Sequence, residues 1–261
     1  MSWTDYPLPI AAEGAPTLKR WRKLRSGELQ NYRDIIVALP PSYQESGRSY
    51  PVVVMHDGQN LFDPVASFAG DWGLVGQLAD LARRQVEAVV VGIANTGPFR
   101  QYEYSPFRDP VHGGGDGDRY LEFIIGAVLP LVRRSFRVLD QPGATSIAGS
   151  SMGGLVSLYA LLKWPQHFGA AAAMSPSAWF AGEALRRVVE ASPPPAGRLW
   201  LDIGTGEGDR TLQSVRRLRD ALIAQGLPVG ERLHYVEDPG ATHQEQDWGR
   251  RFADVMPFLL G

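Results

Sequence analysis

One short segment constrains the fold of this chain more than any other. Within residues 145–154, the run Gly149-Ser150-Ser151-Met152-Gly153 has the form G-x-S-x-G. Small residues precede it as in a buried strand, and apolar residues with helical spacing follow it: Leu155, Val156, Leu158, Tyr159, Leu161 and Leu162. A strand that turns directly into a helix at this motif is a nucleophile elbow, whose tight turn needs small neighbours such as glycine. The alternative is a glycine-rich turn with no chemistry.

The remaining chain alternates apolar strand patterns with helical patterns. Strands are predicted at residues 51–56, 88–93, 170–174, 199–203 and 233–236, and helices at 71–84, 117–134, 181–190, 210–225 and 246–260. Such continuous apolar strands are typical of a parallel sheet buried on both faces. Two earlier strands, at 17–25 and 32–39, are separated by Ser26-Gly27-Glu28, which indicates an antiparallel opening. The pattern predicts an α/β fold with a mostly parallel central sheet and helices on both faces.

Composition restricts the class of protein. The 261 residues show no repeat or linker, so we expect a single domain over 1–261, with residues 1–16 as an irregular arm. The chain has no cysteine, which excludes disulfides, thiolate metal sites and cysteine nucleophiles. A net charge of −2 provides no basic surface for nucleic acid or an anionic membrane. Without a signal-peptide pattern or a membrane-spanning apolar run, we expect a cytoplasmic protein.

A serine nucleophile needs a base, and the base needs an orienting acid. In folds with this elbow the chain order is serine, acid, histidine, and only His167, His234 and His243 follow Ser151. His167 lies at the far end of the predicted helix, and His234 lies inside a strand, where packing is its expected role. His243 follows the carboxyl end of the last strand, at the same sheet edge as Ser151. We therefore predict His243 as the base.

The acid is expected in the loop after the strand at 199–203. This loop offers Glu207 and Asp209. The glycines around Glu207 allow its carboxylate to fold back toward the elbow, whereas Asp209 directly precedes a helical pattern and is a natural N-cap. We predict Glu207, with Asp209 as the alternative.

An oxyanion hole requires two hydrogen-bond donors. The first predicted donor is the backbone N–H of Met152, at the start of the helix. The second should come from the loop after the strand at 51–56, which contains Gly58 and Gln59. The run His112-Gly113-Gly114-Gly115 spells a lipase oxyanion motif, but it follows no strand, and we expect a flexible linker there.

These motifs resemble the putative esterase family of α/β-hydrolases. That family includes enterochelin-type siderophore esterases, S-formylglutathione hydrolases of the esterase D type, feruloyl and acetyl-xylan esterases and mycolyltransferases. The resemblance runs from about Tyr32 to the C-terminus and rests on six segments: residues 38–43, 55–60, 149–154, 174–177, 204–207 and 240–243. It implies the α/β-hydrolase fold, Ser151 as nucleophile, His243 as base, an acid near Glu207 and main-chain oxyanion donors at Met152 and around Gly58 and Gln59.

The resemblance also suggests substrate contacts. Related esterases carry an arginine and a Glu-Tyr pair in the loop that here contains Arg100, Glu103 and Tyr104. Arg100 could clamp an anionic or polyhydroxy substrate, or Arg100 and Glu103 could simply hold the loop in place. Trp72 and Trp179 could line an aromatic or glycosyl pocket, although tryptophan most often packs in a core or its rim.

The sequence thus predicts a serine carboxylic-ester hydrolase that works through an acyl-enzyme, with no metal or organic cofactor. Its expected partner is a small-molecule ester. One alternative is acyl transfer to an alcohol, and another is a non-catalytic binding protein that retains the fold. The sequence does not indicate the acyl group, the alcohol or the oligomeric state.

Overall fold

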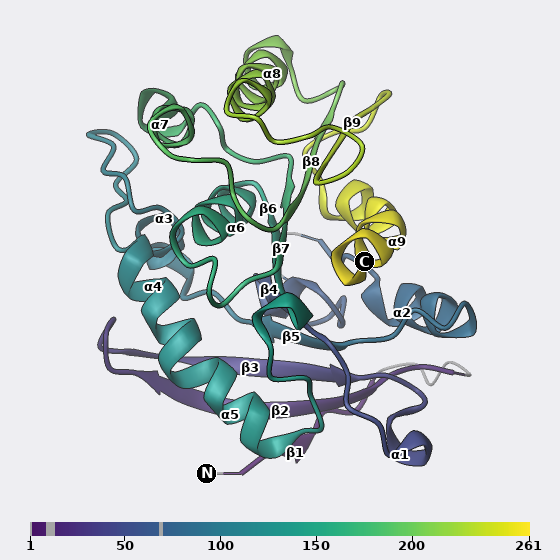
Figure 1. The fold of residues 1–261 in the computed structure, drawn as a ribbon. Helices are drawn as coiled ribbons and strands as arrows, with labels where there is room; N and C mark the ends of the chain where they lie inside the picture. Colours follow the sequence, from purple (N-terminus) through teal and green to yellow (C-terminus); the bar gives the residue numbers. More distant parts are fainter. Residues whose placement is uncertain (1, 9–13, 68–69) are drawn as a thin grey trace.

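A nine-stranded sheet forms the centre of the structure, a computed structural model that describes residues 2–8, 14–67 and 70–261. Among these residues the strand order is β1-β2-β3-β5-β4-β6-β7-β8-β9 (Figure 1). The strands are β1 (Thr4–Asp5), β2 (Thr17–Ser26), β3 (Asn31–Leu39), β4 (Val52–His56), β5 (Val89–Ile93), β6 (Thr145–Ser150), β7 (Ala170–Met174), β8 (Arg198–Gly204) and β9 (Leu233–Asp238).

The sheet is antiparallel at one end and parallel elsewhere. Strands β1, β2, β3 and β5 pair antiparallel in that order, and all pairs from β5 through β4 and β6 to β9 are parallel. The predicted antiparallel opening and mostly parallel sheet are confirmed. The prediction of an irregular arm is wrong at Thr4–Asp5, because these residues pair with Arg20 and Lys19 of β2. Residues 9–13 of that arm lie outside the described residues.

Helices cover both faces of the sheet (Figure 1). On one face lie α2 (Leu74–Arg83) and α9 (Glu245–Leu260), and on the other lie α4 (Gly117–Phe123), α5 (Leu129–Ser135), α6 (Met152–Lys163), α7 (Phe180–Glu190) and α8 (Asp209–Ala224). Alternate residues of β4 point to opposite faces, so Val52 and Val54 pack in one core and Val53 and Met55 in the other. The short helices α1 (Tyr43–Ser46) and α3 (Arg100–Glu103) lie in connecting segments.

Two predicted helices are less regular than their sequence patterns suggested. The helix over 117–134 contains a π-helical segment, Ile124–Val128, directly before α5. Pro130 explains this segment, since proline has no N–H and its ring excludes the carbonyl four residues earlier. In α7, Ala181, Gly182 and Glu183 have φ of 49°, 63° and 62°, so the predicted helical conformation is wrong for these three residues.

The order of the strands creates a crevice at one sheet edge. From β4 the chain passes to β5 on one side, and then returns to β6 on the other side of β4. In parallel sheets such a switch point leaves an opening beyond the carboxyl ends of the adjacent strands, here β4 and β6. The loops that follow β8 and β9 reach the same edge, because these strands run parallel to β6. The topology therefore gathers four loops at one place.

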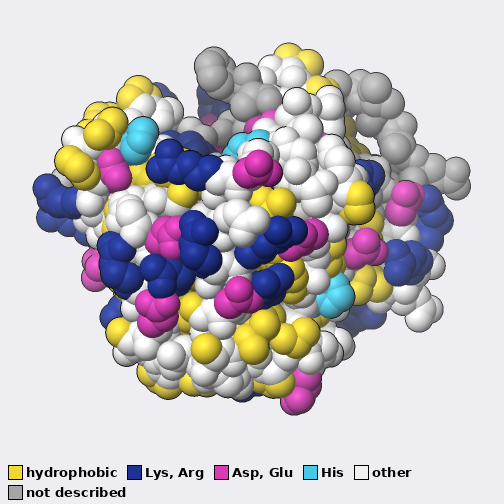
Figure 2. All heavy atoms as spheres, turned by 90° about the horizontal axis from the view of Figure 1, so that it is seen from above, with side chains coloured by type: hydrophobic (Ala, Val, Ile, Leu, Met, Phe, Trp, Pro, Cys, Tyr) yellow, Lys and Arg dark blue, Asp and Glu magenta, His cyan; other side chains and the backbone are white. Residues whose placement is uncertain are grey.

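Charged side chains on the surface are largely paired with opposite charges. Figure 2 looks down on the side of α7 and α8 and shows cationic and anionic side chains interspersed. In this region Arg186 and Arg217 both bind Glu183, and Arg216 binds Glu237. Within the described part of the chain, no helix is both long enough and apolar enough to cross a membrane.

The turn after β4 packs tightly against β5, which generates a stability prediction. A Cβ atom added to Gly58 would lie 2.5 Å from the carbonyl carbon of Gly92. Since the contacted atoms of Gly92 and Ile93 are all backbone, they cannot move aside easily, and Gly58→Ala should lower the free energy of unfolding by about 1–3 kcal/mol, as overpacking typically does. The control is Gly76→Ala in α2, where an added Cβ meets no atom within 4 Å. That change should raise the free energy of unfolding by about 0.5–1 kcal/mol. Urea unfolding would measure both, and a wild-type value for Gly58→Ala would contradict the packing argument.

Candidate active site

Ser151 occupies a strained turn between β6 and α6. Its φ of 58° and ψ of −122° are rare for an L residue, and its N–H donates to the Met174 carbonyl at 3.0 Å. Glycine at position 149 allows the strand, the helix start and His56 to approach one another closely. A Cβ at Gly149 would lie 2.8 Å from the His56 ring and 3.0 Å from the Gly153 carbonyl carbon. The backbone thus has the conformation expected of a nucleophile elbow.

The structure brings Ser151, His243 and Glu207 into one hydrogen-bonded chain. His243 Nε2 lies 3.0 Å from Ser151 Oγ, and His243 Nδ1 lies 2.6 Å from Glu207 Oε2. The carboxylate is only 1% exposed, whereas the imidazole is 43% exposed. Adjacent parallel strands explain the meeting, since Glu207 follows β8 and His243 follows β9.

Glycines allow the loops after β8 and β9 to touch. A Cβ at Gly204 would lie 2.2 Å from the Ala241 carbonyl oxygen, and one at Gly206 would lie 2.9 Å from the same atom. The expectation that this glycine run lets Glu207 fold back agrees with its position. Asp209 lies in the first turn of α8, exposed, and makes no cap, because Gly208 occupies the N-cap position with φ 87°. The N-cap prediction for Asp209 is therefore wrong by one residue.

The environment of Glu207 favours its ionised form. Burial by itself would raise the pKa of this carboxyl group, but hydrogen bonds from His243, Ser175 and the Gly204 N–H bring it below its ordinary value. Gly204 donates to Glu207 Oε1 at 2.9 Å, and the Ser175 hydroxyl donates to the same oxygen at 2.5 Å. An ionised Glu207 can accept a hydrogen bond from the protonated Nδ1 of His243. In that tautomer Nε2 carries no proton and is the acceptor that faces Ser151.

The two predicted oxyanion loops flank Ser151. Gln59 lines the cavity beside Ser151, and its side-chain oxygen accepts a hydrogen bond from the Asn95 N–H at 3.0 Å. The side chain is thus engaged in holding the loop after β5. Gly58 is buried and packs against the backbone of Gly92 in β5. Met152 begins α6, directly after Ser151.

A cavity of about 1020 Å³ opens above Ser151. Trp72 and Trp248 form an aromatic part of its wall, with ring centroids 5.9 Å apart. The remainder of the wall combines polar side chains, among them Asn60, Asn95, Arg100 and Glu245, with Ala94, Gly97 and Pro98. A volume of this size accommodates a substrate as large as a drug-like ligand or larger.

Of the residues predicted to contact substrate, Arg100 and Trp72 line this cavity. Arg100 is also committed to a bidentate ion pair with Asp57, through Nε at 2.8 Å and Nη2 at 2.7 Å. Burial alone would raise the pKa of Asp57, but Arg100 and a hydrogen bond from Asn95 lower it. The observed contacts of Arg100 are therefore those of a residue that holds its loop in place by binding Asp57.

Glu103, Tyr104 and Trp179 do not line the cavity, so their prediction as substrate contacts is wrong. Glu103 is 2% exposed and binds Arg33 at 2.9 and 3.0 Å, because its carboxylate faces the interior. Tyr104 is fully buried, and its hydroxyl accepts the Asp57 N–H at 3.1 Å. Trp179 packs on the His112 ring instead, with centroids 5.5 Å apart.

Two further histidines contact neighbouring side chains away from the proposed triad. His56 is buried between the Tyr120 hydroxyl at 2.8 Å and the Ser157 hydroxyl at 3.1 Å, and burial lowers its pKa to about 3. His234 stacks on Trp200 with ring centroids 4.3 Å apart, but it is exposed, so it packs on the surface and not inside the core.

The loop that contains His112 is tightly turned and does not line the cavity. Asp109 and Gly113 exchange two backbone hydrogen bonds, and a Cβ at Gly114 would lie 2.1 Å from the Phe107 carbonyl oxygen. The structure shows a hydrogen-bonded turn at this place, and the expected flexibility stays a prediction. The expectation that this motif is not an oxyanion loop agrees with its place in the fold.

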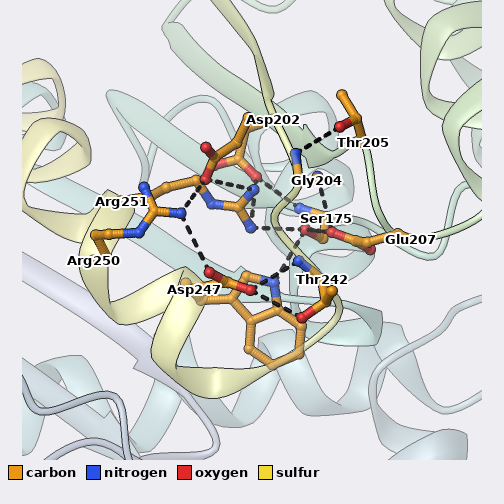
Figure 3. Close-up of polar contacts among 12 residues, drawn as sticks. Ser175, Asp202, Gly204, Thr205, Glu207, Thr242, Asp247, Arg250 and Arg251 are labelled. Atoms are coloured by element: carbon orange, nitrogen blue, oxygen red, sulfur yellow. Dashed lines mark hydrogen bonds and ion pairs between the residues drawn. The ribbon is translucent and has the colours of Figure 1, made fainter.

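Sequence reasoning missed a buried polar cluster behind Glu207. It contains Ser175, Asp202, Trp248 and Arg251, contributed by β7, β8 and α9 (Figure 3). A signal was available, because Asp202 is a charge inside an apolar strand and Arg251 lies beside Phe252 on the apolar side of a helix. Charges at such positions are rarely fully buried unless paired.

Comparison with known proteins gives a consistent assignment. Residues 26–259 match the protein family described as Putative esterase. The uncharacterized protein YbbA of Bacillus subtilis is 28% identical over 88% of this chain and 93% of its own length. The iron(III) salmochelin esterase of Escherichia coli is 26% identical over 84% of this chain and 55% of its own length.

A solved structure supports the fold. The enterobactin esterase of Shigella flexneri, crystallised in the presence of enterobactin, superimposes with a TM-score of 0.74 at 24% identity, over 98% of this chain and 60% of that one. The chain thus spans little more than half of each of these two siderophore esterases. From the family match over nearly its whole length, this chain belongs to the putative esterase family, a group of carboxylic ester hydrolases with the α/β-hydrolase fold.

Proposed function

We propose that this protein hydrolyses a carboxylic ester through an acyl-enzyme, with Ser151 as nucleophile, His243 as base and Glu207 as the orienting acid. The observation that carries this proposal is the chain of hydrogen bonds from Glu207 through both nitrogens of His243 to Ser151, at 2.6 and 3.0 Å. The 3.0 Å between Ser151 Oγ and His243 Nε2 is within the range that proton transfer from a serine to an imidazole requires, and the 2.6 Å contact lets Glu207 orient the imidazole.

The reaction proceeds in two halves. His243 Nε2 takes the proton from Ser151 Oγ as this oxygen attacks the ester carbonyl, and the backbone N–H groups of Met152 and Gln59 stabilise the oxyanion. The imidazolium then gives its proton to the leaving alcohol, which departs and leaves the acyl group on Ser151. Water, activated by His243, hydrolyses the acyl-enzyme. Glu207 stabilises the imidazolium in both halves.

The substrate class that we infer is a bulky ester of the siderophore type. Two observations support it: relatives of this chain include esterases of salmochelin and enterobactin, and the cavity of about 1020 Å³ has an aromatic wall at Trp72 and Trp248. A panel of siderophore, glycosyl and thiol esters would test this class. The highest kcat/KM on a glycosyl or thiol ester would contradict it.

Replacing Ser151 tests the nucleophile. Ser151→Ala should lower kcat by a factor on the order of 10⁶, as loss of a triad serine does, and leave the fold intact. Ser150→Ala should lose far less activity, because its hydroxyl lies outside the proposed hydrogen-bonded chain. Hydrolysis of a nitrophenyl ester and labelling by a fluorophosphonate would measure both. Equal losses in the two variants would mean that the nucleophile is assigned wrongly, and a wild-type protein with neither turnover nor labelling would indicate a binding protein.

A pair of amide variants tests the acid. Glu207→Gln retains the shape of the side chain but removes the charge that stabilises the imidazolium, so kcat should fall by up to roughly 10⁴-fold. Asp209→Asn, an exposed change two residues away, should have little effect on kcat. If Asp209→Asn were the impaired variant, the acid would be Asp209.

The oxyanion donor at Gln59 is testable through its backbone. Gln59→Ala should change kcat only mildly, because it removes the contact with Asn95 and leaves the N–H in place. Gln59→Pro removes the N–H and should lower kcat by about 10²- to 10³-fold. Steady-state kinetics of both variants would decide, and an equally severe loss in Gln59→Ala would assign the role to the side chain.

A further inference from the structure

Ser175 lies at the centre of the buried cluster behind the proposed triad. It follows β7, is fully buried and has a φ of 42°, a backbone conformation that favours glycine. Its hydroxyl contacts three groups, namely Glu207 Oε1 at 2.5 Å, Arg251 Nη2 at 2.9 Å and Trp248 Nε1 at 3.0 Å (Figure 3). The hydroxyl therefore connects α9 with the carboxylate beside His243.

The chemistry of these groups determines where the hydroxyl proton points. An indole N–H and a guanidinium can only donate, so Trp248 and Arg251 occupy the two lone pairs of the Ser175 oxygen. Its single hydrogen must then be donated to Glu207 Oε1. That oxygen also accepts the Gly204 N–H at 2.9 Å, which leaves Oε2 for His243 Nδ1. The network therefore holds Oε1 of Glu207 as an acceptor and fixes the side chain in one orientation.

Arg251 supplies the positive charge of this network. Its side chain is 4% exposed and lies 3.5 Å from the fully buried Asp202. Asp202 in turn accepts hydrogen bonds from Trp200 Nε1 at 2.8 Å and the Ser175 N–H at 3.0 Å. Burial raises the pKa of Asp202 to about 6, although Arg251 opposes this shift. One guanidinium thus lies among three carboxyl groups: Asp202 at 3.5 Å, Asp238 of β9 at 3.8 Å, and Glu207 beyond Ser175.

Stability alone does not favour such an arrangement. Among the described residues, Nε and Nη1 of Arg251 have no hydrogen-bond partner, and a buried donor without a partner is costly. A buried ion pair is often no more stabilising than apolar side chains of similar volume. Within the described part of the chain, the one hydrogen bond that the Arg251 side chain donates is to Ser175, and its ion pairs with Asp202 and Asp238 are longer, at 3.5 and 3.8 Å.

We propose that Ser175 and Arg251 are positioning residues for ester hydrolysis, which fix the orientation and charge of Glu207 through the Ser175 hydroxyl. This inference rests on the proposed triad. Without the hydroxyl, Glu207 keeps its contact with His243, but its carboxylate can shift and take the imidazole with it. A misplacement of about 1 Å at a reacting centre can lower a rate by about 10²-fold. Substrate binding in the cavity should not change, because neither Ser175 nor Arg251 lines it.

The pH dependence separates positioning from a merely structural role. A carboxylate that loses a hydrogen-bond donor becomes more basic and stabilises the imidazolium more strongly. The base then stays protonated to a higher pH, so the acidic limb of the kcat/KM profile should move upward. We expect a movement of roughly half a pH unit to one unit, from the loss of one hydrogen bond to a charged group.

The first test compares Ser175→Ala with Ser146→Ala. Ser146 is also buried, and its hydroxyl donates to the Leu259 carbonyl far along α9 from Glu207. Ser175→Ala should lower kcat by roughly 10- to 100-fold with KM little changed, and it should move the acidic limb upward. Ser146→Ala should leave kcat and the pH profile as in the wild type. If Ser175→Ala does not fold, Ser175→Gly takes its place, because glycine suits φ 42° and also lacks the hydroxyl.

The second test examines Arg251. Arg251→Lys retains the charge and should keep more of kcat than the charge-neutral double variant Asp202→Asn with Arg251→Met. That double variant should lose kcat as Ser175→Ala does, and adding Ser175→Ala to it should cause little further loss, since both act through one hydrogen bond. Additive losses would contradict the proposal.

Other outcomes would overturn the inference while leaving the proposed function intact. A folded Ser175→Ala with wild-type kcat and profile would do so, as would a raised KM at unchanged kcat. A lower kcat with an unmoved acidic limb would indicate general distortion instead. The proposed function itself fails only if Ser151→Ala retains activity or if Ser151 is not labelled, and these results are independent of Ser175.

Discussion

The backbone strain at Ser151 is the constraint on which the site depends. A conformation with φ 58° and ψ −122° costs on the order of 1–3 kcal/mol and persists only when its surroundings hold it. Here the Ser151 carbonyl accepts the N–H groups of Leu155 and Ser177, at 3.1 and 3.0 Å, and its own N–H is bound by Met174. Glycines at 149 and 153 allow the close approach. Every other part of the site has to reach the place that this turn occupies.

The parallel sheet provides that reach. Ser151 and His243 are 92 residues apart in sequence, yet each follows the carboxyl end of a strand of the same sheet. Strands β8 and β9 are neighbours in the sheet, so the loops that carry Glu207 and His243 lie against each other. Gly204 has no side chain, which leaves room for the Ala241 carbonyl between the two loops. The loop that contains Gly58 and Gln59 follows β4, across the switch point. The site is thus a property of strand order more than of any single loop.

Buried ion pairs hold these loops in one arrangement. Arg100 with Asp57 and Arg33 with Glu103 anchor the segments after β4 and β5, while Arg251 with Asp202 lies behind Glu207. Buried pairs of this kind contribute little net stability. Their directional hydrogen bonds do specify one geometry, which matters for groups that must lie within hydrogen-bond distance of each other.

The sequence by itself determined the sheet, the order of its elements and the positions of Ser151, Glu207 and His243, because apolar periodicity and glycine-rich loops at strand ends are local signals. Their catalytic roles remain predictions. Tertiary structure alone decided that Glu103, Tyr104 and Trp179 face away from the cavity, and that Trp248 and Arg251 meet Ser175, which is 73 and 76 residues distant. The physical reason is that the partner of a side chain depends on which distant elements the fold brings close to it. In a loop, a shift of one or two residues also changes whether a side chain faces the cavity or the core.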